Sequence, residues 1–179
     1  MIDIDPADMK SEEERNFYAW LLEAERHGLI GDIEYHGSKK APYKPHTFIL
    51  SERTTTTETV RLKSGKEKTK EKFLLGKHGY TPDFTFTVPN RFTRALCPPT
   101  GKVWVDTKGT YNRGEGSFSI NKKWVFQRFN VFINKVVPEK LFRKTWVPER
   151  ARLTPVKREP VKKYRGVPDI RAFMKKRNV

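Results

Sequence analysis

The first regular pattern of apolar positions lies near the N-terminus and has the period of a helix. Phe17, Leu21 and Ala24 recur at helical spacing, so they form one apolar face. Two start signals precede them, Asp5-Pro6 and Ser11, each of which is typical of a helix N-terminus. The sequence therefore predicts an N-terminal helix that packs one face on the rest of the domain.

Short runs with the alternation of β-strands occupy the middle of the chain. The clearest is residues 80–88, in which Phe84, Phe86 and Val88 alternate with threonines. Ser64-Gly65 lies in a strongly charged segment and predicts a turn. Other predicted strands span residues 29–35, 47–50, 54–62, 103–105 and 141–147. With a helix predicted at 121–135, this order indicates an α/β fold with a small mixed β-sheet flanked by helices.

Composition adds a strong charge to this picture. The chain of 179 residues has a formal net charge of +16, more than solubility requires, which indicates a polyanionic partner such as DNA. From residue 150 onward, eleven lysines and arginines face two acids, and prolines interrupt the apolar pattern. We therefore divide the chain into a folded domain, residues 1–148, and a basic C-terminal arm, residues 149–179. Within the arm, only residues 169–176 have the pattern of a short helix.

Several classes of protein are excluded by what the sequence lacks. Cys97 is the single cysteine, so no disulfide forms within the chain, which fits a reducing compartment. The four histidines and Cys97 lack the spacing of a zinc site. No apolar run approaches the roughly 18 residues of a membrane span, and the acidic N-terminus does not resemble a signal peptide. We expect a cytoplasmic protein with neither a membrane partner nor a small-molecule cofactor.

The candidate chemistry lies at the ends of two predicted strands. Asp83 follows a proline at the head of one, and Asp106 closes another, two residues before Lys108. Carboxylates are the ligands that Mg²⁺ prefers, and a nearby lysine can orient water or stabilise charge during phosphodiester hydrolysis. Alternation along a strand places Asp106 and Lys108 on one face. It directs the side chain of Thr107 away, while the Thr107 carbonyl is a candidate further metal ligand.

The motifs Tyr80-Thr81-Pro82-Asp83-Phe84 and Val105-Asp106-Thr107-Lys108-Gly109 resemble those of the PD-(D/E)xK nuclease superfamily, most closely the phage Holliday-junction resolvases of the endonuclease I type. A Ser-x-x-Glu on the first helix of that family is matched by Ser11 to Glu14. The likeness extends roughly over residues 11–147, and the lysine motif has Asp106 where those resolvases have a glutamate. The charged insertion at residues 39–72 and the arm have no counterpart in it.

The resemblance implies a restriction-endonuclease-like core and Mg²⁺- or Mn²⁺-dependent cleavage of branched DNA by two-metal phosphodiester hydrolysis. It also implies a homodimer and, for a phage-encoded protein, a location in the host cytoplasm. The implied catalytic residues are Glu14, Asp83, Asp106 and Lys108. The implied metal ligands are Glu14, Asp83 and Asp106, to which the strand geometry adds the carbonyl of Thr107. Glu14 also completes a helix capping box with Ser11, so a purely structural role stays open, with Glu13 as the alternative ligand.

Basic residues outside this site are candidates for contact with DNA phosphates. On the predicted second helix they are Lys122, Lys123 and Arg128, together with the polar Gln127. In the arm they are Arg150, Arg152, Lys157, Arg158, Lys162, Lys163 and Arg165. The alternative for both groups is a solvated basic surface.

Two other functions remain open at this stage. One is a nuclease of the same fold that cuts or nicks duplex DNA, in restriction or transposition. The other is a DNA-binding protein without catalysis. Against the second, clustered buried carboxylates repel one another without a metal.

Overall fold

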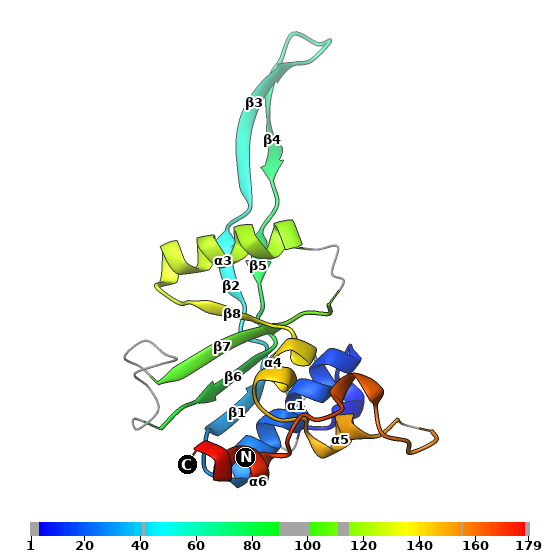
Figure 1. The fold of residues 1–179 in the computed structure, drawn as a ribbon. Helices are drawn as coiled ribbons and strands as arrows, with labels where there is room; N and C mark the ends of the chain where they lie inside the picture. The colour runs from blue at the N-terminus through cyan, green and yellow to red at the C-terminus, as the bar shows by residue number, and fades with distance from the viewer. Residues whose placement is uncertain (1–3, 41, 90–100, 111–114, 155, 178–179) are drawn as a thin grey trace.

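A computed structural model describes residues 4–40, 42–89, 101–110, 115–154 and 156–177, and Figure 1 shows their fold. The chain forms a mixed α/β structure in which a small mixed sheet is flanked by helices, which confirms the fold class expected from the sequence. Cys97 lies outside the described residues. None of the helices in the described ranges combines the length and the apolar character that crossing a membrane requires.

The N-terminal helix uses both of the start signals in the sequence. Asp5 caps a short 3-10 helix, η1 (Pro6–Asp8), by accepting a hydrogen bond from the Ala7 amide. Ser11 caps the main helix, α1 (Glu12–Arg26), by accepting from the amide of Glu14. Phe17, Leu21 and the neighbouring apolar side chains of α1 are buried, as their spacing predicts.

The central sheet contains four strands within the described residues, in the order β1-β6-β7-β8. Its members are β1 (Gly31–Tyr35), β6 (Phe84–Thr87), β7 (Lys102–Thr107) and β8 (Ile133–Val136). The first three pair antiparallel, whereas β8 is parallel to β7 and is reached through helix α3 (Glu115–Phe129). Figure 1 shows α3 crossing the sheet on the opposite side from α1.

Alternation along β7 explains how the sheet serves two apolar cores. Val103 and Val105 pack in the larger core with α1 and with Phe84 of β6. Trp104, between them in the sequence, packs against the second core, in which Val125 of α3 is fully buried. One six-residue strand thus fixes a helix on each of its faces.

An insertion between β1 and β6 forms two antiparallel ribbons. At its base, β2 (Phe48–Ser51) pairs with β5 (His78–Tyr80). Beyond them, β3 (Thr54–Arg61) and β4 (Glu67–Leu75) form a hairpin that projects past α3, away from the sheet (Figure 1). Gly65 adopts a φ of 77° near the tip, which confirms the predicted turn.

Two predicted elements near the C-terminal end of the sheet differ from the structure, one in its bounds and the other in its type. The predicted helix at 121–135 ends at Phe129, because Asn130 turns the backbone to a φ of 53° and the chain enters β8. The predicted strand at 141–147 is mostly helix α4 (Pro138–Lys144), in which the buried residues Pro138 and Phe142 lie four apart. The parallel partner of β7 is therefore β8, and the later apolar run packs as a helix.

The basic segment after residue 148 packs back onto the domain along part of its length. It contains α5 (Glu149–Arg152), η3 (Lys162–Tyr164) and α6 (Ile170–Arg177), and α6 confirms the predicted terminal helix. Trp146 joins this segment to α1. Its ring stacks on that of Trp20, with 4.6 Å between the ring centroids, and lies against that of Phe173, with 5.2 Å between the centroids. Its indole N–H donates to Glu23, which also accepts the Glu149 amide.

Candidate active site

The two strand-end acids of the sequence motif lie beside each other in the sheet. Phe84 pairs with Val105 in the β6–β7 register, which places Asp83 next to Asp106 one step further along. The Asp83 amide donates to the carbonyl of Val105 at 2.9 Å, and this bond fixes the backbone of the first acid. The structure thus brings together two acids that are 23 positions apart in the chain.

Thr107 holds the carboxylate of Asp83. Its amide and its hydroxyl both donate to Asp83 Oδ2, at 2.7 and 2.6 Å. The sequence places this side chain away from the face of Asp106 and Lys108, and the structure gives it a partner, Asp83, that the sequence did not assign. Since both donors use one oxygen, the orientation of the Asp83 carboxylate is fixed.

Asp106 is paired with the predicted catalytic lysine. Lys108 Nζ lies 2.6 Å from Asp106 Oδ2, and the Asp106 carboxylate is buried. This contact has the distance of an ion pair but not the geometry of a hydrogen bond, and Asp106 Oδ2 has no hydrogen-bond partner among the described residues. A buried carboxylate oxygen in that state can accept a further ligand, such as a metal ion.

Tyr80 closes the other side of the Asp106 carboxylate. Burial, followed by the negative charge of Asp106, raises the pKa of the Tyr80 phenol. The two groups lie close together without an aligned hydrogen bond, because the geometry leaves the Tyr80 hydroxyl without a partner in the described part of the chain. Tyr80 packs in the second core, as the sequence indicates, but its hydroxyl also faces the site.

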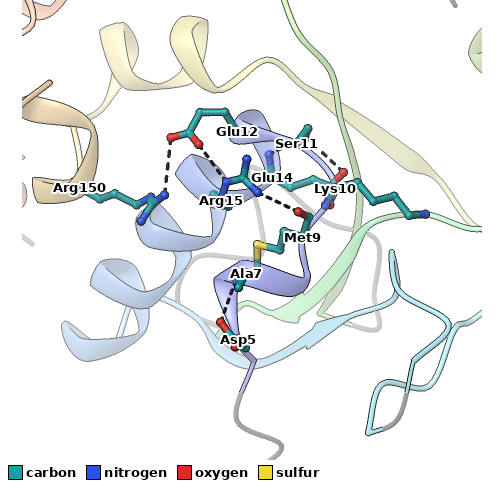
Figure 2. A network of polar contacts seen from close by, with 9 residues as sticks. All are labelled: Asp5, Ala7, Met9, Lys10, Ser11, Glu12, Glu14, Arg15 and Arg150. Carbon is teal, nitrogen blue, oxygen red and sulfur yellow. Dashed lines mark hydrogen bonds and ion pairs between the residues drawn. The ribbon is translucent and has the colours of Figure 1, made fainter. Parts of the chain in front are cut away.

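Glu14 lies in the first turn of α1 (Figure 2), and its negative charge acts on Asp83. Its Oε2 accepts from the hydroxyl of Tyr35 at 2.7 Å and from the Lys10 amide at 3.1 Å. The Ser11 hydroxyl donates to Oε1 at 3.3 Å. The capping interaction considered from the sequence is present, although Glu14 bonds the Lys10 amide and not that of Ser11. Capping does not exclude a ligand role, since Tyr35 ties the same carboxylate to the sheet.

The three acids act on one another electrostatically. Burial, and then the negative charge of Asp106, raise the pKa of Asp83 well above its ordinary value, and Glu14 adds to the effect. The negative charges of Glu14 and Asp83 both help to raise the pKa of Tyr35, after burial and the hydrogen bond to Glu14. A bound cation would remove this repulsion. Even so, no group of three or more His, Cys, Asp or Glu side chains in the described ranges has the arrangement of a metal site.

Glu13, the alternative ligand, faces a different part of the same region. It borders a polar pocket of about 130 Å³ together with Lys108, Glu139 and Lys163. A side chain at Gly109 would meet Glu13 Oε1 at 3.0 Å, so the glycine of the lysine motif lets Glu13 approach the backbone there. Lys163, predicted as a DNA contact, pairs with Glu139 at 3.3 Å in this pocket.

The other predicted DNA contacts differ in whether their side chains are exposed or already engaged in contacts within the protein. On α3, Lys123 and Gln127 are exposed, whereas Lys122 lies 4.0 Å from the ring centre of Phe132 and Arg128 donates to the Leu50 carbonyl of β2. In the C-terminal segment, Arg150 pairs with Glu12 at 3.7 Å (Figure 2), and Arg152 donates to the Val147 carbonyl. The remaining exposed residues are Lys157, Arg158, Lys162 and Arg165.

Two tyrosines, Tyr35 and Tyr80, belong to the site although the sequence did not single them out as functional. Tyr35 is buried in the larger core, yet its hydroxyl orients Glu14. Tyr80 lies three residues before Asp83, and that proximity was the available signal. The partner of Tyr35 could not be read from the sequence, because it depends on how α1 packs on β1.

Comparisons of the chain with models of protein families, with curated proteins and with solved structures find no match.

Proposed function

We propose that the protein is a metal-dependent endodeoxyribonuclease. The observation that carries this proposal is the pair of strand-end acids, half-buried Asp83 beside buried Asp106, with Lys108 at 2.6 Å from Asp106. Glu14 adds a third carboxylate, also buried, from α1. Clustered acids of this kind destabilise a fold unless a cation or a proton neutralises them, so they are best explained by a function that requires them.

The roles of the residues follow from their contacts. When bound, Mg²⁺ or Mn²⁺ supplies an activated water and offsets the charge that develops on the phosphate. Asp83, held by Thr107, and Asp106 are the ligands, with Glu14 as the third and the Thr107 carbonyl as a further candidate. The ammonium of Lys108 is placed to orient the attacking water or to stabilise the phosphate oxygens.

A restriction-endonuclease-like core is the finer fold that we propose. The mixed sheet between α1 and α3 agrees with it, as does the position of the acids at adjacent strand ends. The net charge of +16 favours DNA as the substrate, and branched DNA follows from the resemblance to junction resolvases.

A homodimer is part of the same proposal, since cutting two strands in concert requires two sites. Exposed apolar side chains on and beside α3 support it, because monomers seldom leave such groups together at the surface. They include Ile120, Trp124 and Phe126 on the helix. We also retain the cytoplasmic location, that of the host if a phage encodes the protein, as a proposal.

The proposal is tested with a synthetic four-way junction, a matched duplex and single strands, each with Mg²⁺ or with EDTA. We expect paired symmetrical nicks in the junction with Mg²⁺ and no product with EDTA. Equal cutting of the duplex would favour a duplex-cutting or nicking enzyme. Salt-sensitive binding without cleavage under any divalent metal would leave the non-catalytic DNA-binding protein.

The metal ligand on α1 is identified by thermal unfolding with Mn²⁺. At 100 times its dissociation constant an ion adds about 2.7 kcal/mol to the free energy of unfolding, which raises the Tm of a chain of this size by roughly 5–10 °C. We expect Glu14→Gln to reduce this rise by at least about half, because a ligand is lost. The matched variant Glu13→Gln should leave it unchanged. The reverse result would transfer the ligand role to Glu13.

A further inference from the structure

The hairpin of β3 and β4 has no apolar core of its own. Within the described residues the two strands pair only with each other, and every residue of β4 is exposed. An isolated two-stranded hairpin is marginally stable in water, so it is typically ordered by something that it contacts. Its position beyond α3, away from both cores, leaves its two faces free for a partner (Figure 1).

The register of the hairpin places the lysines of β4 on one face. Lys68 pairs with Val60, Lys70 with Glu58 and Lys72 with Thr56, and paired residues share a face. Lys66 continues the alternation toward the tip, where its carbonyl accepts from the Leu62 amide. We call this set, Lys66, Lys68, Lys70 and Lys72, the lysine face.

The opposite face of the hairpin has a different character. It carries threonines, the acids Glu67 and Glu71, and one cation, Arg61, which pairs with Glu67. On the lysine face, Lys72 forms an ion pair with Glu58 at 3.4 Å. Apart from Arg61, the cations of the two strands are thus on one side, where Glu58 compensates one of them.

The spacing of the lysine face suits a nucleic-acid backbone better than a protein. Alternate residues of a strand lie about 7 Å apart, close to the rise of two base pairs along DNA, about 3.4 Å each. Lysine is depleted in protein–protein interfaces, because its ammonium must lose water there, whereas phosphate contacts let it stay at the surface. A two-stranded ribbon also fits the major groove, which is about 12 Å wide.

The hairpin is joined directly to the candidate active site. β4 leads through Gly76 and Lys77 into β5, and β5 ends at Tyr80, three residues before Asp83. A nine-residue strand extends for about 30 Å, which corresponds to about nine base pairs of DNA. A hairpin lying along DNA from this root would contact the backbone up to nearly one turn from the scissile phosphate.

We propose that the β3–β4 hairpin is a DNA-binding arm whose lysine face contacts the phosphate backbone, without reading sequence, on the duplex that flanks the cleavage site. The inference rests on the proposed function for its choice of DNA as the ligand. It assigns a role to the insertion and adds Lys66, Lys68, Lys70 and Lys72 to the surface that binds substrate.

The test measures binding in EDTA, where no cleavage occurs, by fluorescence anisotropy of a labelled four-way junction over a series of salt concentrations. The affinity falls as salt rises, so the slope of log affinity against log salt is negative. Replacing all four lysines of the lysine face by glutamine should make this slope less steep by about 3–4, since each phosphate contact contributes about 0.9. Replacing the same four by arginine should retain the slope. The control on the opposite face, Thr57→Gln with Thr59→Gln and Thr69→Gln, should retain it too.

A second readout uses the length of the DNA. The wild type and the arginine variant should bind junctions with 15-base-pair arms more tightly than junctions with 6-base-pair arms, whereas the glutamine variant should show little preference. An unchanged slope in a folded glutamine variant that still binds DNA overturns the inference. The inference is also overturned if the glutamine variant has a lower mass than the wild type by light scattering while its slope is unchanged. The hairpin would then join two copies of the chain. If the wild type does not cleave DNA with any divalent metal but the slope changes as expected, the proposed function fails, whereas the DNA-binding role of the hairpin is supported.

Discussion

Asp83→Asn and Lys108→Ala should each reduce DNA cleavage by at least about 100-fold, the scale reported for removing one electrostatic group from an active site. Under the proposed function, Asp83→Asn removes a charged metal ligand, and Lys108→Ala removes the cation that lies 2.6 Å from the Asp106 carboxylate. Affinity for DNA in EDTA should stay within about twofold, because neither side chain belongs to the large basic surface that governs non-specific binding. The measurements are single-turnover cleavage of the junction and anisotropy.

Thermal unfolding separates this expectation from simple loss of structure. Because burial and the charge of Asp106 raise the pKa of Asp83, its ionised form destabilises the folded protein, and Asp83→Asn should unfold at the same or a higher temperature without metal. Lys102→Ala is the matched control for the lysine: Lys102 begins β7, the strand that Lys108 follows, but it pairs with Glu34. Wild-type cleavage by either site variant, or equal loss in the control, would show that the site is elsewhere.

Trp146→Ala should lower the free energy of unfolding by about 3–5 kcal/mol, the usual range for removing a large buried aromatic side chain. Trp146 is 2% exposed, stacks on Trp20 of α1 and contacts Phe173 of α6, so its loss opens a cavity between the domain and the C-terminal segment. The Glu23 carboxylate also loses the indole donor. Urea unfolding followed by circular dichroism gives the value.

The stability loss of Phe173→Ala is the comparison that tests how much Trp146 contributes to the packing of the C-terminal segment. Phe173 is only partly buried, so this variant should lose less, about 1–2 kcal/mol, in proportion to the smaller apolar area that it buries. If Trp146→Ala cost no more than Phe173→Ala, the C-terminal segment would not be packed on α1 as Figure 1 shows.

The parts of the fold that the sequence predicted are those with a local signal. Ser11 and the spacing of Phe17 and Leu21 predict α1, because capping and periodicity depend on a few neighbouring residues. The alternation of Phe84 and Phe86 predicts β6 for the same reason. Asp83, Asp106 and Lys108 were predicted as one site from motif spacing, and the β6–β7 register places them together.

The parts that could not be predicted depend on packing between distant segments. The apolar run at 141–147 is short enough to suit a strand or a buried helix, and only the presence of β8 beside β7 decides for α4. Thr107 bonds Asp83 across 24 positions of the chain, a contact that depends on the pairing of β6 with β7. Tyr35 reaches Glu14 across 21 positions of the chain. The lysine face needs the register of β3 with β4, which the sequence left open.

The insertion also bears on how the chain folds. Tyr35 of β1 pairs with Phe84 of β6, so the sheet closes over a segment 49 positions long. Closure entropy grows only with the logarithm of loop length, by about 0.6 kcal/mol for each doubling. Without the hairpin the loop would be roughly half as long, so the projecting arm reduces equilibrium stability very little. We expect its effect to fall on the folding rate instead: a hairpin of neighbouring residues forms within microseconds, whereas the β1–β6 pairing that completes the sheet needs a long-range contact and is slower.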